Sequence, residues 1–323
     1  MGDPVILRVV SLAVLVACSG PQEDDRSTSP RTVPIAPSAT PTCGSVGSTT
    51  PPSPVVQLVA GALHTCARLG DRSVWCWGAR GQGLIDGDVV GSRPCPIATR
   101  VAELADATKL VGSCALRADD TMRCGDVERG RFDSPVPVPD AVRGVDEEIA
   151  TPTTTCRRRG ATVSCTNEGA DVTLDDHARR IARAERGGWW IVRDDGVLVR
   201  RDLCPTSAKP GCMNSIEERA NVLDVATGDR LECLVDGKGD VWCKDERASA
   251  PQAARGTPPA FAKMEGVRGA TQIAVVKRHV CVLADNDVVC WGNNSCGQSG
   301  GDTMSIERCG SPDVLPTTIR WAK

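Results

Sequence analysis

A pair of cysteines returns along this chain at nearly constant spacing. The two members are nine or ten residues apart, and five pairs share the pattern: Cys66 and Cys76, Cys114 and Cys124, Cys156 and Cys165, Cys233 and Cys243, and Cys281 and Cys290. First members recur every 34–48 residues if Trp190 and Val199 fill one slot that lacks cysteine. A period of this length is typical of an array of small β units, so the sequence predicts a repeat protein.

Each pair brackets a predicted hairpin. Apolar residues alternate on both sides of a short turn, as in Thr65–Leu69 and Val74–Trp77. Asp, Asn and Gly fill the turns, and these residues accept the positive φ angles of tight hairpins. Spacing that is symmetric about the turn puts the two cysteines opposite each other, which predicts five cross-strand disulfides. Trp190 facing Val199 is expected to replace a sixth bridge by a packed apolar pair.

The remaining cysteines lie outside these hairpins. Two further pairs are predicted because each brackets one loop, and a third follows by elimination: Cys204 with Cys212, Cys296 with Cys309, and Cys43 with Cys95. The chain has 17 cysteines, and setting Cys18 aside leaves 16 that can all pair. This parity is expected of an exported protein, because disulfides persist in oxidising compartments.

Residues 1–18 have the features of a bacterial lipoprotein signal. The apolar run Val9–Ala17 is too short to span a bilayer, and its end together with Cys18 resembles the lipobox. Cys18 is therefore the predicted site of lipidation, with an ordinary secretory signal as the alternative. Ser19 follows the cysteine in place of Asp, which favours the bacterial outer membrane or the cell surface over the inner membrane. Residues 19–53 are rich in Ser, Thr and Pro and are predicted to be a disordered tether, followed by a folded domain over residues 54–323.

The composition argues against several kinds of site. The net charge of −3 gives no sign of the basic face that nucleic-acid binding requires. The short CxxC and HxxxH spacings of zinc sites are missing. We therefore predict no metal site, no cofactor and no nucleic-acid partner.

The first and last repeats are the best preserved. Ala60–Ala67 runs into Val74–Gly78, and Arg278–Leu283 runs into Val289–Gly300. These segments resemble repeats of the regulator of chromosome condensation family, which read Ala-Gly, His-Thr/Ser, an apolar hairpin, Trp-Gly, Asn and then Gly-Gln-Leu-Gly. A cysteine-paired version occurs in exported bacterial members. The four middle units keep only the spacing, the hairpin and, in three of them, the cysteines.

The resemblance implies an all-β fold, a β-propeller of four-stranded blades around a channel. Six core hairpins between residues 54 and 323 favour six blades, with seven as the alternative. The segment Pro316–Ala322 repeats the pattern of Pro54–Ala60. We expect it to bring the end of the chain back to the beginning and close the ring, because an open ring would expose sheet edges.

Few residues suggest catalysis. His64 and His279 occupy the same repeat position, which favours a structural role such as a backbone hydrogen bond. His177 has no nucleophile nearby in sequence. Ser299, in Gly297–Gly301, superficially matches the serine loop of chymotrypsin-like proteases, but the segment aligns better as the Gly-Gln-Leu-Gly turn.

Three other groups of residues have a structural and a functional reading. The acidic tip Asp285–Asp287 favours turn chemistry over a calcium loop, because no closing Glu follows. Four tryptophans could form a sugar platform, although core packing is their usual role: Trp75, Trp77, Trp242 and Trp291. The short basic runs Arg157–Arg159 and Arg179–Arg180 are expected to be solvated surface.

The sequence favours a lipid-anchored, extracytoplasmic, non-catalytic scaffold that binds another protein or a surface polymer. Loops of varied length would build its binding faces, near residues 79–100, 126–143, 202–220, 244–266 and 293–313. The alternatives are a hydrolase or lyase acting on extracellular polysaccharide and a structural envelope protein. An enzyme would require two carboxylates, or a His/carboxylate set, converging near the channel.

Overall fold

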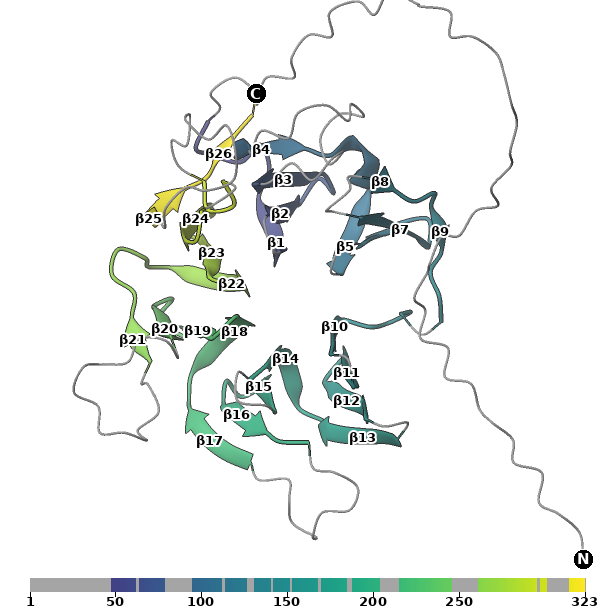
Figure 1. Cartoon of the computed structure of the whole chain (residues 1–323), viewed down its shortest axis with the longest axis vertical. Helices are drawn as coiled ribbons and strands as arrows, with labels where there is room; N and C mark the ends of the chain where they lie inside the picture. The colour runs from purple at the N-terminus through teal and green to yellow at the C-terminus, as the bar shows by residue number, and fades with distance from the viewer. Residues whose placement is uncertain are drawn as a thin grey trace, which may run out of the picture. The chain divides into compact units, whose positions relative to one another are not determined.

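The computed structural model describes residues 48–61, 64–78, 95–111, 114–126, 131–140, 142–151, 153–167, 170–184, 188–203, 215–245, 261–294, 297–300 and 314–322. Six antiparallel sheets stand around a common centre, each with its first strand innermost (Figure 1). The predicted all-β propeller is confirmed, with six blades. Within the described ranges the one helical segment is the 3₁₀ turn η1 (Ala102–Leu104), and no helix there could cross a membrane.

The first three blades are sheets of consecutive strands. Blade 1 contains β1 (Val55–Ala60), β2 (His64–Leu69), β3 (Val74–Gly78) and β4 (Cys95–Arg100). Blade 2 contains β5 (Ala107–Val111), β6 (Cys114–Arg117), β7 (Thr121–Asp126), β8 (Arg131–Phe132) and β9 (Val136–Pro137). Blade 3 contains β10 (Glu147–Ala150), β11 (Thr154–Arg159), β12 (Thr162–Asn167) and β13 (Ala170–Asp175).

The last three blades follow the same plan. Blade 4 contains β14 (Ala178–Arg183), β15 (Trp189–Arg193), β16 (Leu198–Arg201) and β17 (Ser215–Arg219). Blade 5 contains β18 (Val222–Gly228), β19 (Leu231–Asp236), β20 (Val241–Asp245) and β21 (Ala262–Lys263). Blade 6 contains β22 (Ala270–Val276), β23 (His279–Ala284), β24 (Asp287–Gly292) and β25 (Val314–Thr318), and β26 (Arg320–Trp321) follows it.

The five predicted cross-strand disulfides are confirmed. In each hairpin the two cysteines are direct partners in the register of the second and third strands. Their Cα atoms lie 3.9–4.1 Å apart, which fits the narrow, non-hydrogen-bonded pairs of an antiparallel ladder. The bridges join Cys66 to Cys76 in blade 1, Cys114 to Cys124 in blade 2, Cys156 to Cys165 in blade 3, Cys233 to Cys243 in blade 5 and Cys281 to Cys290 in blade 6.

The bridges of blades 3 and 5 differ in their surroundings. Cys165 is fully buried on β12, and its partner Cys156 is fully buried on β11. Cys243 on β20 is only partly buried, although its partner Cys233 on β19 is fully buried. The spacing of these cysteines, nine residues in blade 3 and ten in blade 5, thus predicted their pairing but not their burial.

The three predicted loop disulfides lie outside what the structure describes. Cys204, Cys212, Cys296, Cys309 and Cys43 are not among the described residues, and only the backbone of Cys95 is described. The predicted lipidation site, Cys18, is also outside the described ranges. These pairings and the lipidation therefore stay predictions.

The turn at the hairpin tip explains why the spacing is nine in some pairs and ten in others. Blade 6 turns through two residues, Asp285 and Asn286, both with positive φ, and its cysteines are nine apart. Blade 1 turns through three residues that end with Arg72 at φ 68°, and its cysteines are ten apart. A three-residue turn of this type needs a left-handed residue at its last position. The turn reading of the acidic tip Asp285–Asp287 is therefore confirmed.

The expected pair of Trp190 and Val199 is wrong. Trp190 is opposite Arg200, and Val199 is opposite Ile191. The hairpin of blade 4 turns through three residues ending with Gly196 at φ 80°. Residues paired across this hairpin are therefore an even number of positions apart in the sequence. The nine-residue spacing assumed for the empty slot belongs to a two-residue turn.

Among the residues that the structure describes, buried apolar clusters join five of the six neighbouring blade pairs. One cluster joins blades 6 and 1, and others join blades 1 and 2, 3 and 4, 4 and 5, and 5 and 6. In the first cluster the ring centroids of Trp75 and Trp321 are 5.8 Å apart, an edge-to-face contact. The core is therefore divided among the seams between blades, because a single sheet has two apolar faces to cover.

The end of the chain closes the ring, as expected. β25 is the outer strand of blade 6, and β26 pairs in parallel with β4 of blade 1, where Arg320 is the partner of Ile97. The contact is with the outermost strand of blade 1, although the sequence repeat suggested a likeness to its innermost strand. Ser48, in the predicted tether, forms a β-bridge with Trp321.

The five bridges should differ in their resistance to reductant. Cys114 and Cys124 are both partly exposed, whereas Cys281 and Cys290 are fully buried. Graded reduction with a phosphine, followed by alkylation and peptide mass mapping, should label the Cys114–Cys124 pair before the buried pair, because the reductant must reach the sulfur. Equal or earlier labelling of the buried pair would show that exposure does not control the order.

Candidate functional site

The six first strands surround a central cavity of about 990 Å³. Most of its lining comes from β1, β5, β10, β14, β18 and β22, which are the innermost strands in Figure 1, so every blade contributes. A cavity of this size is within the range of ligand-binding pockets, and it is the natural candidate for a functional site.

One register position of the first strand carries a polar side chain in every blade. In five blades this residue directly follows a β-bulge. In blade 3 it is the residue with the equivalent pairing partner on the second strand. We call these six residues the polar ring: Gln57, Lys109, Glu147, Arg180, Asp224 and Gln272. All six line the cavity.

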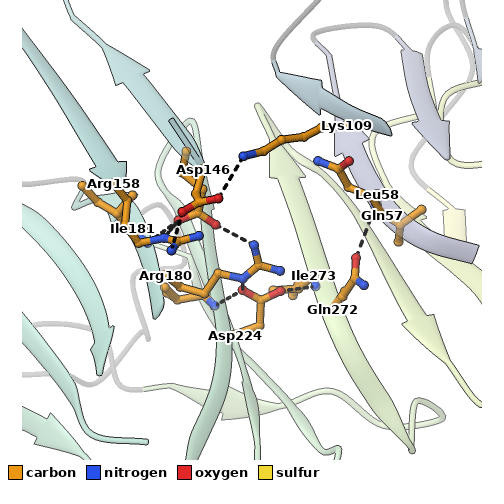
Figure 2. Close-up of polar contacts among 12 residues, drawn as sticks. Gln57, Leu58, Lys109, Asp146, Arg158, Arg180, Ile181, Asp224, Gln272 and Ile273 are labelled. Carbon is orange, nitrogen blue, oxygen red and sulfur yellow. Dashed lines mark hydrogen bonds and ion pairs between the residues drawn. The ribbon is translucent and has the colours of Figure 1, made fainter. Parts of the chain in front are cut away.

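The two glutamines of the polar ring join their blade to the next one. Gln57 Oε1 accepts the Leu110 N–H at 2.9 Å, and its Nε2 donates to the Leu110 carbonyl at 2.8 Å. Gln272 Oε1 accepts the Leu58 N–H at 3.3 Å (Figure 2). Leu110 and Leu58 each directly follow the polar-ring residue of their own strand. The side chain thus satisfies an N–H at the inner edge of a sheet, where no further strand can pair with it.

The two carboxylates repeat this contact. Glu147 Oε2 accepts the Ile181 N–H at 3.0 Å, and Asp224 Oδ2 accepts the Ile273 N–H at 2.9 Å (Figure 2). Ile181 and Ile273 occupy the same position in their strands as Leu58 and Leu110. Four of the six seams are therefore joined by the same side-chain-to-backbone hydrogen bond. Only the bond between Asp224 and Ile273 is fully buried, and losing the acceptor of such a pair costs about 1–3 kcal/mol.

The two cations of the polar ring cannot accept an N–H, and they bind oxygens instead. Lys109 Nζ donates to the Val145 carbonyl at 2.6 Å and lies 3.2 Å from Asp146 Oδ1. Arg180 Nη1 lies 2.5 Å from Glu147 Oε1, and Arg180 Nε lies 3.0 Å from Asp224 Oδ1.

Arg158 completes a series of ion pairs along the cavity wall. Its Nε lies 3.1 Å from Glu147 Oε2, and its Nη1 lies 3.3 Å from Asp146 Oδ2. Charges of alternating sign therefore run from blade 2 to blade 5, and we call this series the charge chain: Lys109, Asp146, Arg158, Glu147, Arg180 and Asp224 (Figure 2).

Burial controls the ionisation of Asp224. Its side chain is 4% exposed, and desolvation raises its pKa to about 6 although Arg180 and the Ile273 N–H favour the charged form. Burial also works to raise the pKa of Asp146, but the Gly160 N–H and the Lys109 ammonium outweigh it and hold that pKa below its usual value.

Converging carboxylates near the channel are the expected mark of an enzyme. Glu147 and Asp224 do converge, since both bind Arg180. Their four oxygens, however, already accept from arginines or backbone N–H groups. A general acid or base needs an oxygen that can reach the substrate. In this arrangement the carboxylates join blades.

The expectation that the arginine runs are solvated surface is wrong for four of the five residues, since only Arg159 among them is exposed. The Arg158 side chain is only 14% exposed, and Arg180 lies between two carboxylates. The sequence pattern missed them because their direction depends on strand register and on a bulge that leaves no residue-type signature.

The two repeat-position histidines support the seam between blades 6 and 1. His279 Nε2 lies 3.1 Å from Thr65 Oγ1, and the His279 ring also makes the expected backbone hydrogen bond, with Val276. Burial lowers the pKa of His64 to about 4, and burial with the neighbouring His64 lowers the pKa of His279 to about 4. A Cβ added to Gly61 would lie 1.9 Å from the His64 ring, which explains the Ala-Gly of this repeat.

The other candidate residues have structural partners or lie at the surface. Ser299 is buried, and its Oγ lies 2.9 Å from the Asn293 carbonyl oxygen, which fits the turn reading. Exposed His177 pairs with Asp176 at 2.7 Å and lies close to Asp175. The carboxylate of Asp175, however, binds two arginines, at 2.8 and 3.2 Å.

The tryptophans pack as core residues in three of four cases. Trp75, Trp77 and Trp291 are buried in the seam clusters. Trp242 is half-buried, with the Arg219 guanidinium 4.1 Å from its ring centroid. The platform reading therefore has no support from the three buried rings.

Asp224→Asn should change the pH dependence of stability. The unfolded carboxyl has a pKa of 3.8 and the folded one a pKa of about 6. The stabilisation that this shift represents is present below pH 3.8 and is lost as the pH rises through about 6. The stability advantage of the wild type over the variant should thus fall by on the order of 2–3 kcal/mol between pH 4 and pH 7 in denaturant titrations. Asp140→Asn, at an exposed carboxylate, is the control. A stability advantage of the wild type over Asp224→Asn that grew with pH would contradict the raised pKa of Asp224.

Comparison with known proteins identifies the repeats. Residues 55–83 and 270–298 match the regulator of chromosome condensation (RCC1) repeat, so the predicted resemblance is confirmed at the first and last blades. A comparison with curated protein sequences found no match.

Several solved structures are similar at low sequence identity. Yeast RCC1 (Prp20) bound to Kap60 is 16% identical, with 82% of this chain and 75% of that chain covered and a TM-score of 0.47. Prp20p from Saccharomyces cerevisiae, described with its binding to Gsp1p and histones, is 15% identical, with 82% and 77% covered and a TM-score of 0.48. Human WBSCR16 is 13% identical, with 83% of each chain covered and a TM-score of 0.45.

Proposed function

We propose that this chain is a lipid-anchored, extracytoplasmic β-propeller that binds a protein partner and catalyses no reaction. The observation that carries the proposal is the set of five disulfides, one in each of five blades. Bridges of this number persist in oxidising compartments and are rare in the cytosol. They fit the lipobox-like sequence that ends at Cys18.

A binding role fits the way the polar groups of the cavity are used. The charge chain joins neighbouring blades, so these charged groups serve to hold the blades of the scaffold together. Rigid scaffolds commonly carry recognition on the loops between their strands. Most residues of the loops predicted to form the binding faces lie outside the described ranges.

The anchor can be tested with one cysteine variant. Cys18→Ala should abolish metabolic labelling with palmitate in a bacterial host and should release the protein from the membrane fraction, because the acylated thiol is lost. Cys43→Ala, the other cysteine of the N-terminal segment, should keep both the label and the membrane location. Persistent labelling of the Cys18→Ala protein would overturn the lipoprotein assignment.

Binding can be tested by chemical cross-linking of the full chain in intact envelopes, followed by purification and mass spectrometry. One protein should be recovered with the oxidised chain and lost after reduction of the bridges. An unrelated lipoprotein cross-linked in the same way is the control. Recovery of the same mixed set of proteins with both chains would contradict the proposal. Release of sugars from envelope polysaccharide that Glu147→Gln abolishes would support the hydrolase alternative instead.

A further inference from the structure

One seam of the ring has no shared apolar cluster of the kind found in the others, although Val145 in its connecting segment is buried. The five buried apolar clusters bridge every neighbouring pair of blades except blades 2 and 3. This holds for the described residues, which include the first three strands of both blades.

The sequence difference responsible lies in one cross-strand pair. In five blades, the residue after the polar ring and its partner on the second strand are apolar and belong to the cluster shared with the preceding blade: Leu58 with Ala67, Leu110 with Ala115, Ile181 with Ile191, Val225 with Leu234 and Ile273 with Val282. In blade 3 this pair is Glu148 and Arg157. These two side chains form an ion pair at 2.6 Å, and each remains 29% exposed.

The opposite wall of this seam is also incompletely covered. The cysteine bridges of blades 1, 3 and 6 belong to the cluster shared with the following blade. By the same register, the Cys114–Cys124 bridge of blade 2 faces blade 3. Both of its cysteines are partly exposed, as are Leu116 and Met122 beside them. Blade 2 thus presents an apolar face to a neighbour that presents charges.

Polar contacts with partial exposure hold the two blades together. Lys109 reaches Val145 and Asp146 across the seam, and the Lys109 and Asp146 side chains are 26% and 39% exposed. In the segment that connects the blades, Arg143 pairs with Asp120 at 2.5 Å, with exposures of 50% and 62%. Exposed ion pairs contribute little to stability and are screened by salt, whereas buried apolar contacts are not.

We infer that the seam between blades 2 and 3 is the built-in opening point of the ring, where a local separation gives access to the central cavity from the side. β5 and β10 are the first strands on its two sides, and both line that cavity (Figure 1). Opening there breaks the Lys109 contacts and leaves the five apolar seams intact. Local opening of this kind draws on the least stable contacts of a fold.

The direct test restores the missing packing. The double variant Glu148→Leu with Arg157→Ala copies the pair Leu58 and Ala67 of blade 1. In hydrogen–deuterium exchange of the full chain, amides of β6, β7 and β10 should exchange roughly tenfold to a hundredfold more slowly than in the wild type, as expected for one newly buried leucine. Amides of blades 5 and 6 should be unchanged. Unchanged exchange at the seam, or an equal slowing in every blade, would overturn the inference.

Removing the polar contact should act in the opposite direction. Lys109→Met should accelerate exchange in β6, β7 and β10. The matched control is Lys263→Met, which removes the Lys263–Asp240 ion pair within blade 5 and should leave this seam unchanged. Equal acceleration by both variants would contradict the assignment.

The wild-type chain supplies a measurement that needs no variant. Raising the salt concentration should accelerate exchange at β10 and leave β22, in an apolar seam, unaffected. The same response at both strands would also overturn the inference.

Discussion

A four-stranded blade cannot cover both of its own faces, and this constraint governs the whole molecule. The apolar side chains on a blade are buried by contact with the next blade. Most of the stabilising apolar contacts therefore lie between blades and not within one sheet. The cysteine bridges of blades 1, 3 and 6 belong to these walls, since they lie in the buried clusters shared with the following blade. The contact between β26 and β4 then makes the first blade a neighbour of the last.

The polar ring shows how the same constraint acts at the centre. The innermost strand of each blade has an edge that no further strand can pair with, and four side chains of the ring accept an N–H from the next edge. Where lysine or arginine occupies the position, the seam relies on ion pairs instead. Charged groups that would suggest catalysis in a cavity can therefore be explained by blade contacts.

The hairpins and their bridges could be predicted from sequence because both depend on local spacing. Cys66 and Cys76 needed only a symmetric turn between them. The partner of Trp190 could not be found in this way, since turns of two and three residues give partners of different separation. The polar ring was missed for a related reason: Arg180 and Asp224 each follow a bulge, and their contacts cross to another blade. The residue type at this position changes from blade to blade, and its partner lies in another blade, so these contacts could not be read from one sequence.

The two kinds of hairpin tip have a consequence for how such a chain can evolve. A tip of two residues and a tip of three both leave the sulfurs directly opposed, as blades 6 and 1 show. Gain or loss of one codon at the tip is thus absorbed by a change of turn type, from two left-handed residues in blade 6 to one, Arg72, in blade 1. An insertion elsewhere in either strand would turn every later side chain to the other face. The tips are therefore the places where this architecture tolerates a change of length.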